Sequence, residues 1–306
     1  MRKTCLEMIF ELAKTDPRVV FIGSDLGSGT LDIFQKEMPE RFFMEGISEA
    51  NIIGVASGLA MEGKIPFVNT IASFITRRAF EQVVLDVCLH NLNVRLVGNG
   101  GGLVYAPLGP THMTIEDIAI MRAIPNMTVV APADENEMKR FMLKTLNYSG
   151  PIYIRLAKGY DPVVTNNLPF DIGKAVIMKE GNDAAIFTTG ITLKIALECA
   201  EDLIKKGVLV SVIHLPTIKP LDIMSILQVI KNISVIVTIE EHSIMGGIGS
   251  ALGEIILEEN FPTQKKFKRI GISDIFPDEY GTQASLMDRF SINRNNLIKT
   301  ILQLLS

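Results

Sequence analysis

The chain has 306 residues, enough for two domains of ordinary size that each bury a core. Hydrophobic residues make up 47% and charged residues 21%, and the formal net charge is −4 without a long basic run, so the composition is neither disordered nor nucleic-acid-binding. No uncharged apolar run approaches the roughly 20 residues of a membrane span, so we expect no membrane partner.

The cysteines and the apolar content bear on compartment and assembly. Cys5, Cys88 and Cys199 are far apart in the sequence and form no CxxC pair. We therefore expect reduced thiols in a cytoplasmic protein. We interpret the apolar excess as surface buried between subunits, with one thick core as the alternative.

Apolar, β-rich runs alternate with helix-period segments throughout the chain. Strands are expected at residues 19–22, 66–69, 93–98, 127–131, 152–156, 184–188, 208–214 and 234–240. Such runs predict an α/β fold of mainly parallel sheets flanked by helices. A stretch rich in Pro, Gly and Asn predicts a linker. The sequence thus predicts two α/β domains, residues 1–160 and 183–306, joined by residues 161–182.

Three segments, "IGSDLGSGTLDIF", "NTIASFITRRAFEQ" and "GNGGGLVYAPLGPTHMTIEDIA", follow expected strands of the first domain. Because parallel strands end at one edge of a sheet, the three predict a ligand pocket there. Taken singly, each is consistent with an ordinary turn. His112, in the long Gly-rich segment, is the histidine that we expect to face a ligand.

Glu49 stands at the start of an apolar helical run. Considered by itself it is a helix-terminus acid that complements the helix dipole, with Ser48 as the N-cap. A Gly-rich turn further on, "VTIEEHSIMGGIGSALGE", is similar in outline to a dinucleotide fingerprint. Its third glycine is missing, which disfavours that interpretation.

The segments "MRKTCLEMIFEL", "GISEANIIGVASGLAMEGKIPFV", "GPTHMTIEDIAIMRAIPNMTVVAPADENEM" and "VTIEEHSIMGGIGSAL" together resemble the C-terminal half of transketolase. They are also similar to the matching half of 1-deoxyxylulose-5-phosphate synthase, and 2-oxo acid dehydrogenase beta subunits share the two-domain layout. The resemblance covers essentially the whole chain. It implies a thiamine-diphosphate pyrimidine-binding domain followed by a transketolase C-terminal domain.

The family's GDG…N motif, which binds the Mg²⁺-diphosphate end of thiamine diphosphate, does not occur in the sequence. The chain therefore resembles the smaller subunit of a split transketolase. The resemblance implies a separate N-terminal subunit that carries GDG…N and most of the Mg²⁺ contacts. It also implies a homodimer contact and a two-plus-two heterotetramer.

The resemblance assigns roles at the cofactor. Glu49 matches the glutamate that activates thiamine diphosphate by holding a proton against its aminopyrimidine ring. Phe74 matches the aromatic residue that stacks on that ring. Asp25 and Leu26 match a loop that lies against the cofactor.

It also assigns roles at a sugar phosphate or modified sugar substrate. His112 matches a substrate-facing catalytic histidine. Arg2 and Arg155 match arginines that grip a phosphate, a task that suits a bidentate guanidinium. Arg77 or Arg78 matches a substrate-facing arginine of the synthases, and an apparent one-residue insertion leaves open which; we assign Arg77.

Two positions depart from the transketolase pattern. Leu108 stands where transketolases carry an aspartate that reads a sugar hydroxyl, and Gly100 replaces a histidine. An apolar Leu108 leaves that hydroxyl unpaired, so we expect a non-standard donor or acceptor, such as a modified or nucleotide-linked sugar or another 2-keto compound.

The function expected from these features is thiamine-diphosphate-dependent transfer of a two-carbon ketol unit. The enzyme alternatives are a 2-oxo acid dehydrogenase beta subunit and an enzyme like 1-deoxyxylulose-5-phosphate synthase. The GPTH loop and the Arg155 segment favour transketolase. A non-catalytic scaffold or regulatory subunit is the alternative from another class, and the presence of Glu49, Phe74 and His112 argues against it.

Overall fold

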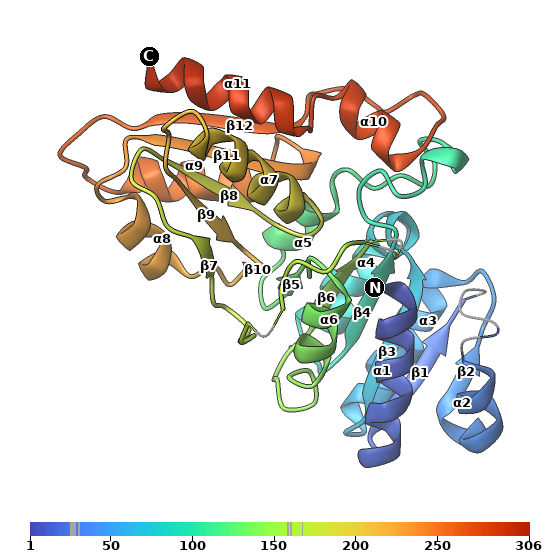
Figure 1. Ribbon diagram of the computed structural model, residues 1–306. Helices are drawn as coiled ribbons and strands as arrows, with labels where there is room; N and C mark the ends of the chain where they lie inside the picture. Colours follow the sequence, from blue (N-terminus) through green and yellow to red (C-terminus); the bar gives the residue numbers. More distant parts are fainter. Residues whose placement is uncertain (25–28, 30, 158, 160, 167) are drawn as a thin grey trace.

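The computed structural model describes residues 1–24, 29, 31–157, 159, 161–166 and 168–306. Within these residues the chain forms two α/β units, each built around its own sheet (Figure 1). The predicted fold class is confirmed, because nearly all neighbouring strands in both sheets run parallel.

The first sheet has the strand order β10-β5-β6-β4-β3-β1-β2, and only the edge strand β10 is antiparallel. Its strands are β1 (Val19–Gly23), β2 (Phe42–Met44), β3 (Ile65–Ile71), β4 (Arg95–Asn99), β5 (Thr128–Val130), β6 (Ile152–Leu156) and β10 (Thr217–Lys219). β1, β3, β4 and β6 are buried along almost their whole length, as the continuous apolar runs predict.

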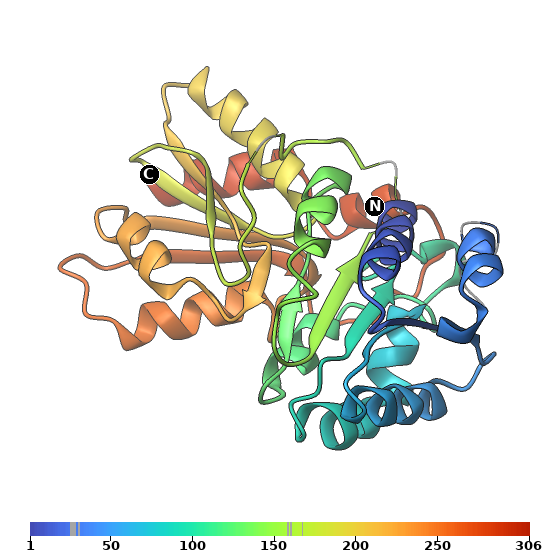
Figure 2. The same ribbon diagram turned by 90° about the horizontal axis from the view of Figure 1, so that it is seen from below.

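Helices cover both faces of this sheet. One face packs against α1 (Arg2–Thr15), α2 (Asp32–Glu37) and α6 (Glu135–Met142). The other packs against α3 (Glu49–Met61), the π-helical turns η2 (Phe74–Arg78) and η3 (Val83–Cys88), and α5 (Asp117–Ala123). Figure 2 shows the dark-blue α1 and the cyan segment of α3 and η3 on opposite sides of the sheet.

The second sheet has the order β12-β11-β8-β9-β7, with β7 antiparallel to β9. Its strands are β7 (Val176–Lys179), β8 (Ala184–Thr188), β9 (Val210–His214), β11 (Val235–Ser243) and β12 (Lys266–Ile272). The helices of this unit are α7 (Thr192–Ile204), α8 (Ile223–Ile230), α9 (Ile248–Glu258), α10 (Gln283–Arg289) and α11 (Arg294–Leu305). α7 and α11 cover one face, and α8 and α9 cover the other.

Every strand expected from the sequence is present, but four others were not predicted: β2, β7, β10 and β12. β7 lies inside the predicted linker and pairs with the second sheet, and β10 pairs with the first sheet although it follows β9 in the chain. The apolar core between α3 and α5 therefore continues into α8 and α9. The boundaries at residues 160 and 183 stay a prediction.

The three cysteines are free and buried in these cores. Burial raises the pKa of each thiol, to about 12 for Cys5, Cys88 and Cys199. Such thiols are poor nucleophiles and poor metal ligands, because the thiolate is the reactive form. Their packing role is consistent with the expected reduced state.

Candidate functional site

Glu49 is the first residue of α3, and its side chain is only 4% exposed. Ser48 occupies the N-cap position, but its hydroxyl donates to the carbonyl oxygen of Glu45 (2.9 Å), and the side chain does not cap the helix. Ser48 is therefore the N-cap residue, as predicted, but its side chain does not supply the capping hydrogen bond. The carboxylate of Glu49 instead pairs with Arg78, with Oε2 3.2 Å from Nη1.

Phe74 and Arg78 begin and end the π-helical turn η2, which follows β3. The guanidinium carbon of Arg78 lies 3.8 Å from the centroid of the Phe74 ring. A flat, nitrogen-rich cation thus rests on an aromatic face while it donates to the Glu49 carboxylate. π-Helical turns of this kind are frequent at functional sites.

His112 lies beside the same aromatic ring. Its centroid is 5.2 Å from that of Phe74, with the planes at 61°, and Tyr105 is 6.4 Å away in a second edge-on contact. The Thr111 hydroxyl lies 2.9 Å from Nδ1 of His112. The structure therefore brings together Glu49, Phe74 and His112, three residues predicted from separate segments.

The two adjacent arginines of η2 have different partners. Arg77 forms an ion pair with Glu116 and donates from Nη2 to the carbonyl oxygen of Met113 (2.9 Å). It therefore holds the segment that follows His112, whereas Arg78 faces Glu49. The assignment of Arg77 to the substrate stays a prediction. The sequence could not choose between the two arginines, and in the structure it is Arg78 that faces Glu49.

Among the described residues, Arg155 and Arg2 are not part of this cluster. Arg155, at the end of β6, is nearly buried and donates from Nε to Asp117 (2.7 Å) and from Nη2 to the carbonyl oxygen of Glu241 (2.9 Å). Burial lowers the Arg155 pKa, but the carboxylates of Asp117 and Glu241 outweigh it and hold the pKa above its ordinary value. Arg2 is exposed at the start of α1. Asp25 and Leu26 lie outside the described residues.

Tyr105 is a site residue that the sequence did not suggest. Gly100 has φ +74°, and a Cβ there would lie 2.1 Å from Cε2 of Tyr105. The Tyr105 ring thus fills the space that a side chain at position 100 would need. Leu108 is 49% exposed in the short 3-10 turn η4 (Ala106–Leu108) of the same loop. No local pattern predicts the Gly100–Tyr105 contact.

The cluster can be tested for fit to an aminopyrimidine ring. The Arg78 guanidinium shows that a planar group with N–H donors can contact the Glu49 carboxylate and the Phe74 face together. A flat nitrogen heterocycle needs the same two contacts, so these residues fit the ring. Within the part of the chain that the structure describes, no group of three or more His, Cys, Asp and Glu side chains is arranged to hold a metal ion.

Comparison with known families agrees with this geometry. Residues 1–161 match the family described as "Transketolase, pyrimidine binding domain", and residues 173–297 match "Transketolase, C-terminal domain". The chain belongs to the transketolase family. Both the predicted resemblance and its extent over the whole chain are thereby confirmed, including the relation to 1-deoxyxylulose-5-phosphate synthases.

Relatives extend the family assignment. The chain is 37% identical to a 6-deoxy-6-sulfo-D-fructose transketolase subunit of Clostridium sp. (strain MSTE9), over 98% of this chain and 92% of the relative. It is 35% identical to one of the subunits of an apulose-4-phosphate transketolase of Actinobacillus succinogenes, over 89% and 87%. A solved structure titled "Split gene transketolase, inactive beta4 tetramer" superposes with a TM-score of 0.90 at 34% identity, over 99% of this chain and 97% of that one.

No helix among the described residues has the length and apolar character that a membrane crossing needs.

Proposed function

We propose that the chain is the smaller subunit of a split transketolase that transfers a two-carbon ketol unit with thiamine diphosphate. The observation that carries this proposal is that Glu49 and Phe74 both contact one planar group, the Arg78 guanidinium. His112 lies at the edge of the Phe74 ring. The relatives named as transketolase subunits support it.

Each residue of the cluster has a task that its position suits. When bound, thiamine diphosphate supplies the electron-accepting centre for breaking and forming the carbon–carbon bond. Glu49 holds a proton against a ring nitrogen of the aminopyrimidine, and Phe74 supplies the face on which the ring lies. His112 donates or accepts a hydrogen bond at a hydroxyl or carbonyl group of the donor sugar. Because Arg78 occupies the ring's position, it must turn away when the ring binds.

A separate partner subunit completes the site in this proposal. The sequence lacks the GDG…N motif, so the diphosphate and Mg²⁺ are held mainly by the partner. The outer face of α3, the helix that Glu49 begins, carries Gly54, Val55, Gly58 and Met61, all exposed. Such an apolar, small-residue face permits close approach of another chain. The related beta4 tetramer, described as inactive, supports a homodimer contact and a requirement for the partner, as expected for a two-plus-two heterotetramer.

We propose a non-standard sugar phosphate or modified sugar as the substrate. Leu108 and the ring of Tyr105 over Gly100 give the loop an apolar and aromatic character where the transketolase pattern has polar groups. The relatives named for 6-deoxy-6-sulfo-D-fructose and apulose-4-phosphate act on unusual sugars. Both sugars differ from ordinary ketose phosphates, which supports a pocket with altered polar contacts.

The test is reconstitution with a partner chain that carries GDG…N. We expect ketol transfer that needs both chains and thiamine diphosphate, with a modified sugar preferred over xylulose 5-phosphate. Glu49→Gln should lower kcat by roughly 10²–10⁴-fold, as expected for loss of a positioned acid–base group. Persistence of turnover within a few-fold would contradict the role of Glu49, and activity with lipoamide instead would favour the 2-oxo acid dehydrogenase alternative.

A further inference from the structure

The loop that carries His112 contains short turns, held by backbone hydrogen bonds such as those from Ala106 to Leu103 and from His112 to Gly109, and a backbone bridge closes it at its base. Gly102 and Thr114 form an isolated antiparallel bridge, with N–O distances of 2.8 and 2.9 Å in the two directions. Between them the chain runs through Tyr105, Leu108 and His112, with only the short turn η4 as regular structure. The placement of His112 against Phe74 therefore depends on what holds this bridge, together with the Arg77 contacts to Met113 and Glu116.

A carboxylate from the second unit lies against that bridge. Glu241, near the end of β11, accepts a hydrogen bond at Oε1 from the backbone N–H of Leu103 (2.8 Å). The same oxygen accepts from Nε2 of Gln283 in α10 (2.9 Å). Gly102 has φ +72°, and a Cβ there would lie 2.5 Å from the Glu241 carboxyl carbon. Glycine at position 102 thus leaves the space that the Glu241 side chain fills.

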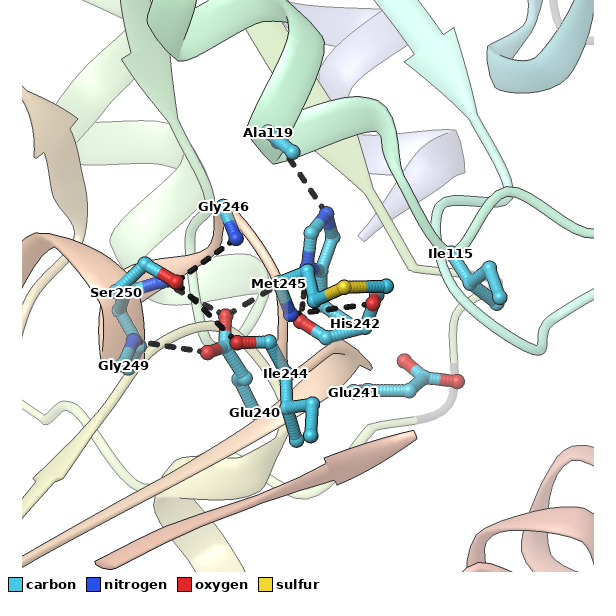
Figure 3. Close-up of polar contacts among 12 residues, drawn as sticks. Ile115, Ala119, Glu240, Glu241, His242, Ile244, Met245, Gly246, Gly249 and Ser250 are labelled. Carbon is cyan, nitrogen blue, oxygen red and sulfur yellow. Dashed lines mark hydrogen bonds and ion pairs between the residues drawn. The ribbon is translucent and has the colours of Figure 1, made fainter. Parts of the chain in front are cut away.

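The residues after Glu241 hold the far end of the loop. The backbone N–H of Ser243 donates to the carbonyl oxygen of Ile115 (2.7 Å), and Nε2 of His242 accepts from the N–H of Ala119 (3.3 Å). Figure 3 shows the His242 ring directed at Ala119, with Ile115 at the right of the view. Residues 241–243 thus contact both ends of the loop and the start of α5.

The side chain of Glu240 points the opposite way from that of Glu241. It accepts from the N–H groups of Ile248 and Gly249 (2.9 Å each), at the first turn of α9. Successive strand residues point to opposite faces, so Glu240 stays within its own unit while Glu241 reaches the loop (Figure 3). The Glu240 carboxylate also fills the anion position of the Gly-rich turn before α9, which accounts for that motif without a bound dinucleotide.

We infer that Glu241 is a positioning residue, through which the C-terminal unit sets the placement of His112 beside the proposed cofactor ring. Glu241 does not touch the Glu49–Phe74 pair, so it acts through the backbone of Leu103 and the Gly102–Thr114 bridge. The consequence for turnover rests on the proposed ketol-transfer function, but the effect on the loop does not.

Hydrogen exchange on the full chain tests the loop directly. In Glu241→Ala, amides of residues 102–116 should exchange at least about tenfold faster than in the unaltered chain, because the buried hydrogen bond from the Leu103 N–H to the Glu241 carboxyl is lost. Glu241→Gln should retain most of the protection. The Leu103 N–H and Nε2 of Gln283 both donate to Oε1 of Glu241, and the glutamine side-chain oxygen can accept both bonds in its place. Glu240→Ala is the matched control: α9 should lose protection and the loop should not.

If Glu241→Ala fails to fold, Gln283→Ala serves in its place and should give a smaller acceleration confined to the same residues. Equal loop exchange in the unaltered chain and in every folded Glu241 or Gln283 variant would overturn the inference.

In the reconstituted complex, Glu241→Ala should raise KM for the sugar about tenfold or more while the Kd for thiamine diphosphate changes less than about twofold. Glu241→Gln should restore KM. If the unaltered complex shows no ketol transfer, the proposed function fails, while the exchange result still decides the positioning role. Faster loop exchange with an unchanged KM would overturn the link to His112.

Discussion

The Glu49–Arg78 ion pair is half-buried, since Glu49 is almost covered and 48% of the Arg78 side chain is exposed. Such pairs contribute on the order of 0–1 kcal/mol. Arg78 lies where the aminopyrimidine ring is proposed to bind, so its contacts compete with the ring in the cofactor-free chain. A competition of this size between Arg78 and the ring is measurable as a change in the affinity for thiamine diphosphate.

Arg78→Met should remove that competition. We expect thiamine diphosphate to bind the reconstituted complex up to about fivefold more tightly, because no ion pair has to be broken. If Arg78 turns toward an anionic group of the substrate, KM for the sugar should rise in the same variant. Isothermal titration and steady-state kinetics measure the two effects. Weaker cofactor binding in Arg78→Met would show that the arginine supports the ring instead.

The Gly100–Tyr105 contact predicts a second result. Gly100→Ala should lower the free energy of unfolding by roughly 2–5 kcal/mol, from about 1–2 kcal/mol of left-handed backbone strain and about 1–3 kcal/mol of overpacking against the Tyr105 ring. In the background of Tyr105→Ala only the strain should remain. Urea denaturation of the four proteins gives the coupling energy. Additive effects would mean that the ring moves aside at no cost.

These residues also show where sequence reasoning ended. The family resemblance identified Glu49, Phe74 and His112, which lie together in the structure. It could not separate Arg77 from Arg78, because adjacent residues on a helical turn point about 100° apart and only the register of the turn on β3 decides.

Arg155 shows a different limit. Its two partners, Asp117 and Glu241, are 38 and 86 residues away in the sequence. No local pattern can reveal that both residues accept hydrogen bonds from the Arg155 guanidinium. Nor can it reveal that the Glu241 side chain accepts a hydrogen bond from the backbone N–H of Leu103.

Among the elements, length and burial decided what was predictable. β1, β3, β4 and β6 are continuous apolar runs in the interior of a parallel sheet, and each was expected. β2 and β10 are three-residue edge strands, and β12 alternates exposed and covered residues at the edge of its sheet. Short edge strands have little apolar signal, so their pairing is set by neighbours distant in sequence.

α3 carries a prediction of its own. A Cβ at Gly58 meets nothing within 4 Å, so Gly58→Ala should stabilise the isolated chain by roughly 0.5–1 kcal/mol through reduced backbone entropy. If the partner packs closely on this face, the same methyl group should weaken association by roughly 1–3 kcal/mol through overpacking. Denaturation of the single chain and titration with the partner measure the opposite signs.

Gly253→Ala in α9 is the matched control for that experiment. Its Cβ would lie at an ordinary 3.6 Å from Phe267 within the second unit. It should change stability in the isolated chain and leave partner affinity as it was. Equal partner affinity in Gly58→Ala and the unaltered chain would mean that the outer face of α3 is not an interface.

The two units are joined by buried ionisable groups, which make the stability of the whole molecule depend on pH. Glu241 is fully covered, and burial raises its pKa from 4.5 to about 7, partly offset by Arg155 and by the donors Gln283 and Leu103. Asp117, which also faces this cluster, raises it further. Glu240 is a second buried carboxyl on the same strand, and burial raises its pKa as well.

Because the folded state holds the Glu241 proton more tightly than the unfolded state, this group's contribution is fully present below about pH 4.5 and is lost as pH rises through about 7. The unfolding free energy of the unaltered chain, relative to Glu241→Gln, should therefore fall by roughly 2–4 kcal/mol between pH 5 and pH 8. The comparison with the amide cancels groups common to both proteins, including Glu240, Asp117 and His242. Urea denaturation across this range measures the difference. A difference that stays constant with pH would mean that Glu241 keeps an ordinary pKa, and that its ionisation does not lower the free energy of unfolding.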